Sequence, residues 1–274
     1  METHYDIYSV ADYLEILKTF SHYGIEGCRD NVQLYFRGEP EDYATAGQPG
    51  IARGKWLEGN NESDLFRESE RRLSHEFVSC KSTFEKLVLM QHYGIATRVL
   101  DVSVVSLQAL FFALYHDPKY EYEDKKDSVV LIYEVSKDSI RSWHSDTVSI
   151  ISNIAIYNYD DLDISGLSNS TDEYERATFN ENDSIKHLLH EIRAEKPYFV
   201  DWIKKDNMES VYCVHPLLDN PRIRSQQGAF LLFGIDGDKH HLATLESNKG
   251  PEIRMSVSMA KLQSNITNNW SVAL

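Results

Sequence analysis

Residues 91–101 hold the densest group of side chains in this chain that could do chemistry. The segment reads QHYGIATRVLD, and its polar members are Gln91, His92, Thr97, Arg98 and Asp101. A strongly apolar stretch, VSVVSLQALFFALY, follows at once. Buried polar groups need hydrogen-bond partners, and buried charges need opposite charges. The segment therefore predicts either a structural hydrogen-bond network or a functional site.

Two interpretations stay open for these side chains. Thr97, Arg98 and Asp101 could form a self-satisfied loop, with Asp101 paired to an arginine and capping an apolar helix that begins near Val104. Alternatively they take part in catalysis, and the N-terminus of that helix suits a phosphate. His92, beside Gln91 at a predicted helix end, is either a general base or a core residue.

A second candidate lies at Arg37 and Gly38, where a run typical of a strand (VQLYFR) ends in a turn. The planar guanidinium of arginine suits a phosphate or a carboxylate. Glycine permits close approach of a ligand. The structural alternative is an ion pair of Arg37 with Glu39 or Asp101.

A third candidate precedes Gly228. Two arginines and two amides could contact a nucleotide there, or they could form a polar turn over the core; these residues are Arg222, Arg224, Gln226 and Gln227. The sequence has no HExxH, GxSxG, Walker loop or GxGxxG motif, so we expect no metal site, hydrolase elbow or dinucleotide fingerprint.

The elements that must position these residues follow from apolar spacing and turn residues. We predict helices over 8–19 (capped by Ser9), 63–80 (capped by Ser63), 83–92, 105–115 and 184–195. We predict strands over 32–37, 128–135, 211–215 and 230–235, with an edge strand at 251–257. The helix at 105–115 is apolar on nearly every side, which predicts a core position. The order favours an α+β fold, with helices in the N-terminal half packed on a mixed, mainly antiparallel sheet.

Composition narrows the function classes. A net charge of −15 over 274 residues argues against non-specific nucleic-acid binding, which needs clustered lysine and arginine. Acidic runs at 120–127, 159–165 and 170–184 predict solvated surface, or a surface that contacts a protein partner. We expect no membrane span and no secretory leader. The three cysteines include no CxxC pair and fit a reduced, cytoplasmic setting.

Three segments together resemble the FRG domain family, named for its Phe-Arg-Gly motif. Here the motif is Phe36-Arg37-Gly38, followed by QHYGIATRVLDVS (91–103) and NPRIRSQQGAFLLFG (220–234). The chain departs from the family pattern at Ala96, where proline is usual, and at Val102 and Ser103, where tryptophan and threonine are usual. The resemblance implies a single FRG-type domain over 1–274 with its core at roughly 30–240, an N-terminal helix at 8–19 and a C-terminal strand and tail. It also implies that the protein is bacterial and acts as a toxin or an antiphage effector.

Two functional hypotheses follow. In the first, the layout loosely resembles the Arg–Ser–Glu layout of one ADP-ribosyltransferase branch and uses NAD. Arg37 would hold the pyrophosphate, Ser103 or Thr97 would position the nicotinamide ribose, and Gln226 or Gln227 would stand where the catalytic glutamate should be. In the second, the same residues form a non-catalytic module that binds a nucleotide, a small phosphorylated ligand or a protein. A magnesium nuclease ranks behind both, because the carboxylates lie in predicted loops.

Overall fold

The computed structural model describes residues 4–20, 31–59, 61–115, 127–159, 161–168, 172–217 and 228–261. Their strands are β1 (His4–Ile7), β2 (Val32–Glu39), β3 (Val99–Ser103), β4 (Ser128–Ser136), β5 (Ile140–Ser142), β6 (Val211–His215), β7 (Gly228–Phe233), β8 (Ile235–Asp236), β9 (Asp238–Leu242) and β10 (Ile253–Ala260). Their helices are α1 (Val10–Thr19), α2 (Asn61–Arg72), α3 (Ser74–Phe77), α4 (Thr83–His92), α5 (Ser106–Leu114), α6 (Asp146–Ile154), α7 (Glu173–Asn180), α8 (Asp183–Glu195) and α9 (Lys205–Met208). Two 3-10 turns, η1 (Gly50–Ala52) and η2 (Lys137–Ser139), complete the set.

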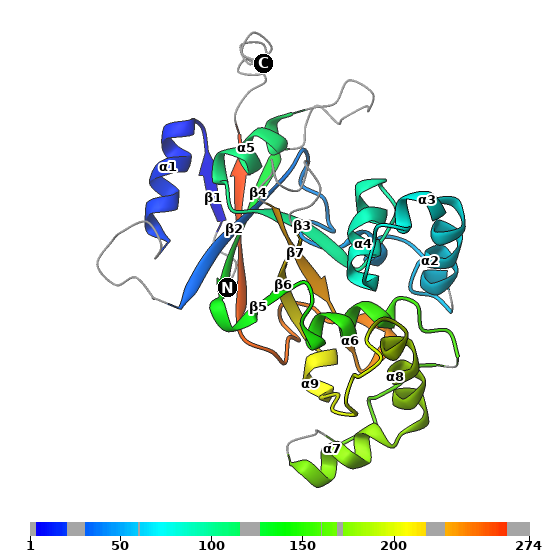
Figure 1. The fold of residues 1–274 in the computed structure, drawn as a ribbon. Helices are drawn as coiled ribbons and strands as arrows, with labels where there is room; N and C mark the ends of the chain where they lie inside the picture. The colour runs from blue at the N-terminus through cyan, green and yellow to red at the C-terminus, as the bar shows by residue number, and fades with distance from the viewer. Residues whose placement is uncertain are drawn as a thin grey trace.

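One eight-stranded sheet, in the order β1-β10-β4-β2-β3-β7-β6-β5, organises the described residues. The pairs β1–β10 and β5–β6 are parallel and the others are antiparallel. The α+β class and the mixed, mainly antiparallel sheet are therefore confirmed. Helices are not restricted to the N-terminal half, because α6 to α9 form a further layer below β6 and β7 (Figure 1).

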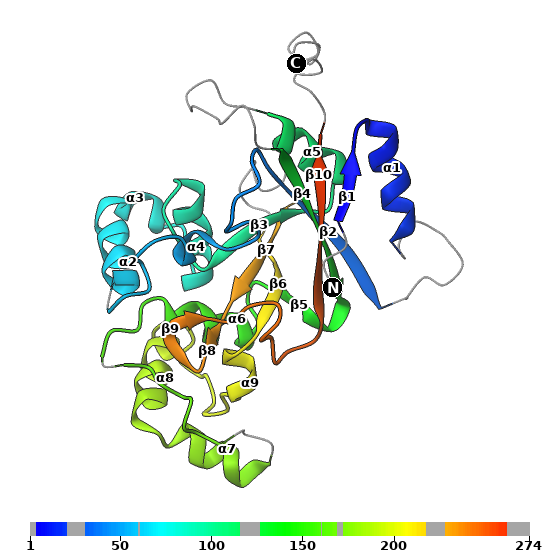
Figure 2. The same ribbon diagram turned by 180° about the vertical axis from the view of Figure 1, so that it is seen from behind.

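The sheet folds back on itself. The hydroxyl of Tyr35 on β2 is 2.7 Å from Nε2 of His215 on β6, although β3 and β7 lie between these strands in the sheet order. The face between the two halves carries an apolar core that includes Tyr35, Leu100, Tyr133 and Cys213. Helices cover the outer faces (Figures 1 and 2): α1 and α5 pack against β2 and β4, whereas α4 and α6 pack against β3, β6 and β7.

Several predicted elements match closely, and others need correction. Ser9 caps α1 through a hydrogen bond from the Asp12 amide. Ser63 is not a cap, because α2 begins at Asn61 and Ser63 is buried within it. The predicted helix at 63–80 breaks at Leu73, which brings the rings of Phe66 and Phe77 to 6.3 Å.

Two further predictions were wrong. Helix α5 is not enclosed by the core: it packs one side on the sheet and leaves Leu107 and Phe112 exposed. The segment near 251–257 is not an edge strand, since β10 lies between β1 and β4. The prediction missed β1 because its pairing partner lies at the other end of the chain.

Candidate functional site

The two halves of the sheet meet between β2 and β3, and Arg37 lies at this junction. These strands are in register at a single pair, Phe36 with Ser103. Alternation along β2 places Arg37 and Glu39 on the same face as Tyr35. The opposite face of β2 is covered by α5. The guanidinium therefore lies on the inner face, where β2 and β3 separate.

Arg37 binds two carboxylates. Its Nε donates to Oε1 of Glu39 at 2.9 Å, and its Nη1 donates to Oδ1 of Asp101 at 2.5 Å and to the Asp101 carbonyl at 3.1 Å. Burial alone lowers the pKa of Arg37, but the charges of Asp101 and Glu39 more than offset it and raise the pKa above its ordinary value. Both ion pairs that the sequence suggested for Arg37 are formed.

A loop is tied to this centre by Arg53. Its Nη2 donates to Oε1 of Glu39 at 3.3 Å and to the carbonyls of Thr45 and Gln48 at 3.4 and 3.1 Å. Within the loop, Gly47 has a positive φ of 74° and lies against the Tyr133 hydroxyl. Arg53 thus holds segment 45–48 over the inner face of β4.

Asp101 receives a second donor from α4. Nε2 of Gln91 lies 2.6 Å from Oδ1 of Asp101, whose side chain is 55% exposed. Asp101 is not the cap of the apolar helix, because it lies inside β3. Ser103 is at that helix end: its Oγ accepts from the Val105 amide at 3.0 Å and donates to Oε1 of Gln108 on α5 at 3.0 Å.

We call the set Arg37, Glu39, Arg53, Gln91, Asp101 and Tyr133 the polar cluster. Four of its polar atoms are buried and have no hydrogen-bond partner among the described residues: Glu39 Oε2, Arg53 Nε, Gln91 Oε1 and the Tyr133 hydroxyl. Burial raises the pKa of Tyr133, while the charge of Arg37 opposes the shift, so the phenol stays protonated and can donate. Unsatisfied buried groups are rare in folded proteins, and their concentration here indicates a site for a ligand or for bound water.

Arg98 belongs to a different network. Its Nε donates to Oε1 of Glu62 at 2.8 Å, its Nη2 binds the other carboxylate oxygen, and its Nη1 donates to the Phe233 carbonyl at 3.1 Å. The Arg98 side chain is 0% exposed. Thr97 is also buried, and its Oγ1 has no hydrogen-bond partner among the residues that the structure describes. The arginine that pairs with Asp101 is thus Arg37 and not Arg98, the other arginine that the sequence left open.

Gly38 and His92 directly follow Arg37 and Gln91 in the chain. The close approach at Gly38 is made by α5: a Cβ there would lie 1.9 Å from the Ala109 carbonyl oxygen. His92 ends α4, is exposed, and has its ring edge-on to Tyr93 at 5.5 Å.

The late segment, 220–234, joins the other two segments in the sheet at Gly228. Gly228 pairs with Ser103, which pairs in turn with Phe36. One residue from each of the three segments singled out in the sequence therefore lies in a row across β2, β3 and β7. The four polar residues before Gly228 lie outside the described residues; they are Arg222, Arg224, Gln226 and Gln227.

Sequence reasoning missed Arg53 and Tyr133 as members of the cluster, and it considered Glu39 only as an ion-pair partner. Tyr133 lies in a β-branched run that predicts a central strand, and its register opposite Tyr35 is a property of strand pairing. Arg53 lies in a glycine-rich loop without periodicity. The alternation Arg37-x-Glu39 was the one available indication that Glu39 shares the face of Arg37.

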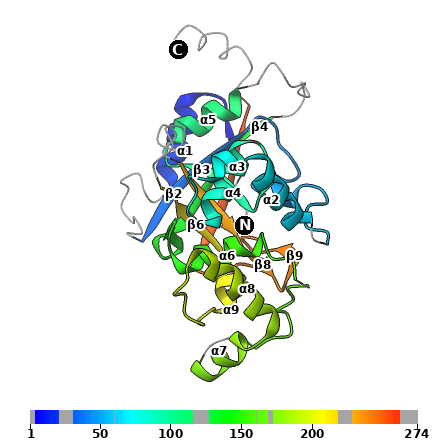
Figure 3. The same ribbon diagram turned by 45° about the vertical axis from the view of Figure 1, so that its right-hand side comes forward.

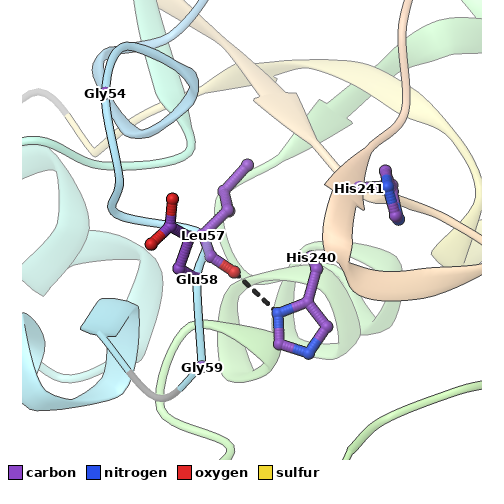
Figure 4. A pocket seen from close by; sticks show the side chains of 6 residues that line it. All are labelled: Gly54, Leu57, Glu58, Gly59, His240 and His241. Carbon is purple, nitrogen blue, oxygen red and sulfur yellow. Dashed lines mark hydrogen bonds between the residues drawn. The ribbon is translucent and has the colours of Figure 1, made fainter.

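A separate hollow of about 570 Å³ opens beside the Arg53 loop, lined by Gly54, Leu57, Glu58, Gly59, His240 and His241. Figure 4 shows the His240 ring directed at the Leu57 carbonyl, with Nδ1 at 2.6 Å from that oxygen. Nε2 of His240 is 3.3 Å from Oδ1 of Asp161. The hydrogen bond to Leu57, together with Asp161, raises the pKa of His240. Viewed from the side, β8 and β9 lie next to α6 and α8 (Figure 3).

The described part of the chain holds neither a group of three potential metal ligands nor a helix that could cross a membrane. No three His, Cys, Asp or Glu side chains there are arranged to hold a metal ion. None of its helices combines the length and apolar character needed to cross a membrane.

Comparison with known families gives one match. Residues 32–122 match the FRG domain model. The matched segment contains β2, β3 and α5, and with them most of the polar cluster; Tyr133 and the late motif lie beyond it. No curated protein and no solved structure matches the chain.

Proposed function

We propose that this chain, whose residues 32–122 form an FRG domain, binds NAD at the polar cluster and transfers its ADP-ribosyl group. One observation carries the proposal: Phe36, Ser103 and Gly228 form a row across three adjacent strands. The row brings the Arg37 strand, the Asp101–Ser103 strand and the end of the late Gln-x-Gly motif together. This is the order of parts in an Arg–Ser–Glu transferase layout, so its support is an analogy of arrangement.

The chemistry needs a negative charge near the reacting carbon. Transfer breaks the bond from C1′ of the nicotinamide ribose to the ring nitrogen, and nicotinamide leaves with the electron pair. An acceptor hydroxyl or water then bonds to C1′ and releases its proton. The ribose carbon passes through an oxocarbenium-like state, which a carboxylate stabilises. Gln226 and Gln227 are neutral, whereas Asp101 offers a carboxylate that is 55% exposed.

The test is incubation of the purified protein with NAD, following both thermal stabilisation and nicotinamide release. We expect both signals in the wild type and their loss in Arg37→Ala, because the guanidinium organises Glu39 and Asp101. In Asp101→Asn we expect NAD stabilisation to persist and nicotinamide release to fall by at least ~100-fold. If the wild type neither binds NAD nor releases nicotinamide, the proposal is wrong.

The alternative is a non-catalytic nucleotide-binding module. The specific observation in its favour is that Arg37 is already held between two carboxylates, so the site is ordered without a substrate. Stabilisation by NAD or ATP without turnover selects this alternative. The FRG resemblance further suggests a cytoplasmic toxin or antiphage effector, with the acidic surface open to a protein partner.

A further inference from the structure

The unpartnered atoms of the polar cluster define what kind of group it can bind. Glu39 Oε2 and Gln91 Oε1 are acceptors, Arg53 Nε is a donor, and the Tyr133 hydroxyl can do either. Glu39 and Tyr133 are 2% and 0% exposed, so neither atom can be satisfied by bulk water. A group that satisfies this set must both donate and accept hydrogen bonds.

The charges of the polar cluster also favour an uncharged ligand over a phosphate. Arg37 and Arg53 are balanced by Glu39 and Asp101, with the ion pairs Arg37–Glu39, Arg37–Asp101 and Arg53–Glu39 formed. A phosphate only accepts hydrogen bonds, and its charge would face two carboxylates. A phosphate beside Arg37 would therefore meet the repulsion of Glu39 and Asp101, which already neutralise the guanidinium.

We infer that the polar cluster recognises the uncharged ribose of a nucleotide, through its hydroxyl groups, rather than the phosphates. A vicinal diol supplies two donors and two acceptors, and carboxylates are common partners of ribose hydroxyls. Glu39 Oε2 accepts from one hydroxyl, and the Tyr133 phenol donates to the diol. The inference rests on the proposed function for the ligand being a nucleotide. It deepens that function by assigning the ribose to this cluster and the phosphates elsewhere.

The loop over β4 controls access. Gly47 lies over the Tyr133 hydroxyl; a Cβ built there would be 3.1 Å from the oxygen and 2.8 Å from Sδ of Met255. Arg53, whose side chain is 36% exposed, bonds the loop to Glu39. Release of Arg53 breaks its bonds to the loop and leaves Glu39 Oε1 bound to Arg37 alone, so ribose entry is coupled to displacement of the loop.

Two tyrosines offer a matched pair of variants. Tyr133 and Tyr35 face each other in the β2–β4 register, and both are fully buried. The Tyr35 hydroxyl is satisfied by His215 at 2.7 Å, whereas the Tyr133 hydroxyl has no hydrogen-bond partner in the described part of the chain. Tyr133→Phe should therefore keep or raise the unfolding temperature and weaken ribose binding by about tenfold or more. Tyr35→Phe should lower the unfolding temperature and leave binding unchanged.

The experiment is calorimetric titration of the full chain with adenosine, nicotinamide riboside, inorganic pyrophosphate and NAD. Binding of a riboside but not of pyrophosphate, weakened in Tyr133→Phe and kept in Tyr35→Phe, supports the inference. If pyrophosphate competes with NAD while the ribosides do not, the inference is overturned and NAD binding stands. If a riboside binds but NAD does not, the transferase proposal fails and the ribose assignment remains. Binding by none of the four probes overturns both.

Discussion

Arg37, in the Phe-Arg-Gly motif, and Arg98, in the segment 91–103, lie in opposite environments. Arg98 is fully buried, and all three of its nitrogens bond to Glu62 or to the Phe233 carbonyl. Arg37 is 20% exposed and binds two carboxylates whose surroundings contain unpartnered atoms. A closed network stabilises a fold, whereas an unsaturated one has bonds left to offer a ligand. The comparison separates Arg98, whose network is closed, from Arg37, which we propose as the binding arginine, by the state of their neighbours.

The largest effect is expected at Arg98. Arg98→Ala leaves the Glu62 carboxylate buried without its partner, which should lower the free energy of unfolding by ~3–5 kcal/mol. Urea denaturation followed by tryptophan fluorescence measures the change. Arg98→Met combined with Glu62→Leu removes both charges and should recover part of the loss. A double variant no more stable than Arg98→Ala would show that packing, rather than the unpaired charge, sets the cost.

The next largest loss in the free energy of unfolding is expected for substitution of Gly38, which tests whether the Phe-Arg-Gly motif is partly structural. Gly38→Ala places a Cβ 1.9 Å from the Ala109 carbonyl oxygen and 2.5 Å from the Ala113 nitrogen, so α5 must move away from β2. We expect a loss of ~2–3 kcal/mol in the free energy of unfolding. Gly166→Ala is the control, because nothing lies within 4 Å of a Cβ there. Equal stability of the two variants would remove the packing role from Gly38.

Much of this comparison could be predicted from the sequence, and the rest could not, for physical reasons. The strand at β2, the helix α4 and the Arg37–Glu39 ion pair follow from local periodicity and from a short separation along the motif, whereas Arg37 and Asp101 lie 64 positions apart. Arg98 could not be distinguished from Arg37, because its partner Glu62 lies in a segment with no indication of pairing. The unpartnered atoms depend on the register between β2 and β4, whose paired residues are about a hundred positions apart. Strand pairing over such distances leaves no local trace in the sequence.

Substitution of Asp101 tests the contrast between Arg37 and Arg98 with little expected loss of stability. Asp101→Asn removes a carboxylate that is 55% exposed, so the free energy of unfolding should fall by about 1 kcal/mol or less. Asp201 is a matched control, since it pairs with Arg193 and is 56% exposed. Both variants should unfold near the wild-type urea concentration, while nicotinamide release from NAD falls only in Asp101→Asn. A loss above ~2 kcal/mol in Asp101→Asn would place Arg37 in the structural class with Arg98.

The smallest effect is expected at His240, which fixes the far end of the Arg53 loop. Protonated His240 can donate from Nδ1 to the Leu57 carbonyl and from Nε2 to Asp161, whereas the neutral ring has one N–H. Because the folded-state pKa is raised above the ordinary 6.5, the stabilisation is complete below that value and is lost as pH rises through the folded-state pKa. The difference in unfolding free energy between wild type and His240→Ala should therefore be about 1 kcal/mol or less near pH 5.5 and should shrink toward pH 8. His241→Ala controls for the general loss of an imidazole on the same strand. A difference that stays constant with pH would mean that the loop is held by packing, and that only Arg53 ties it to the polar cluster.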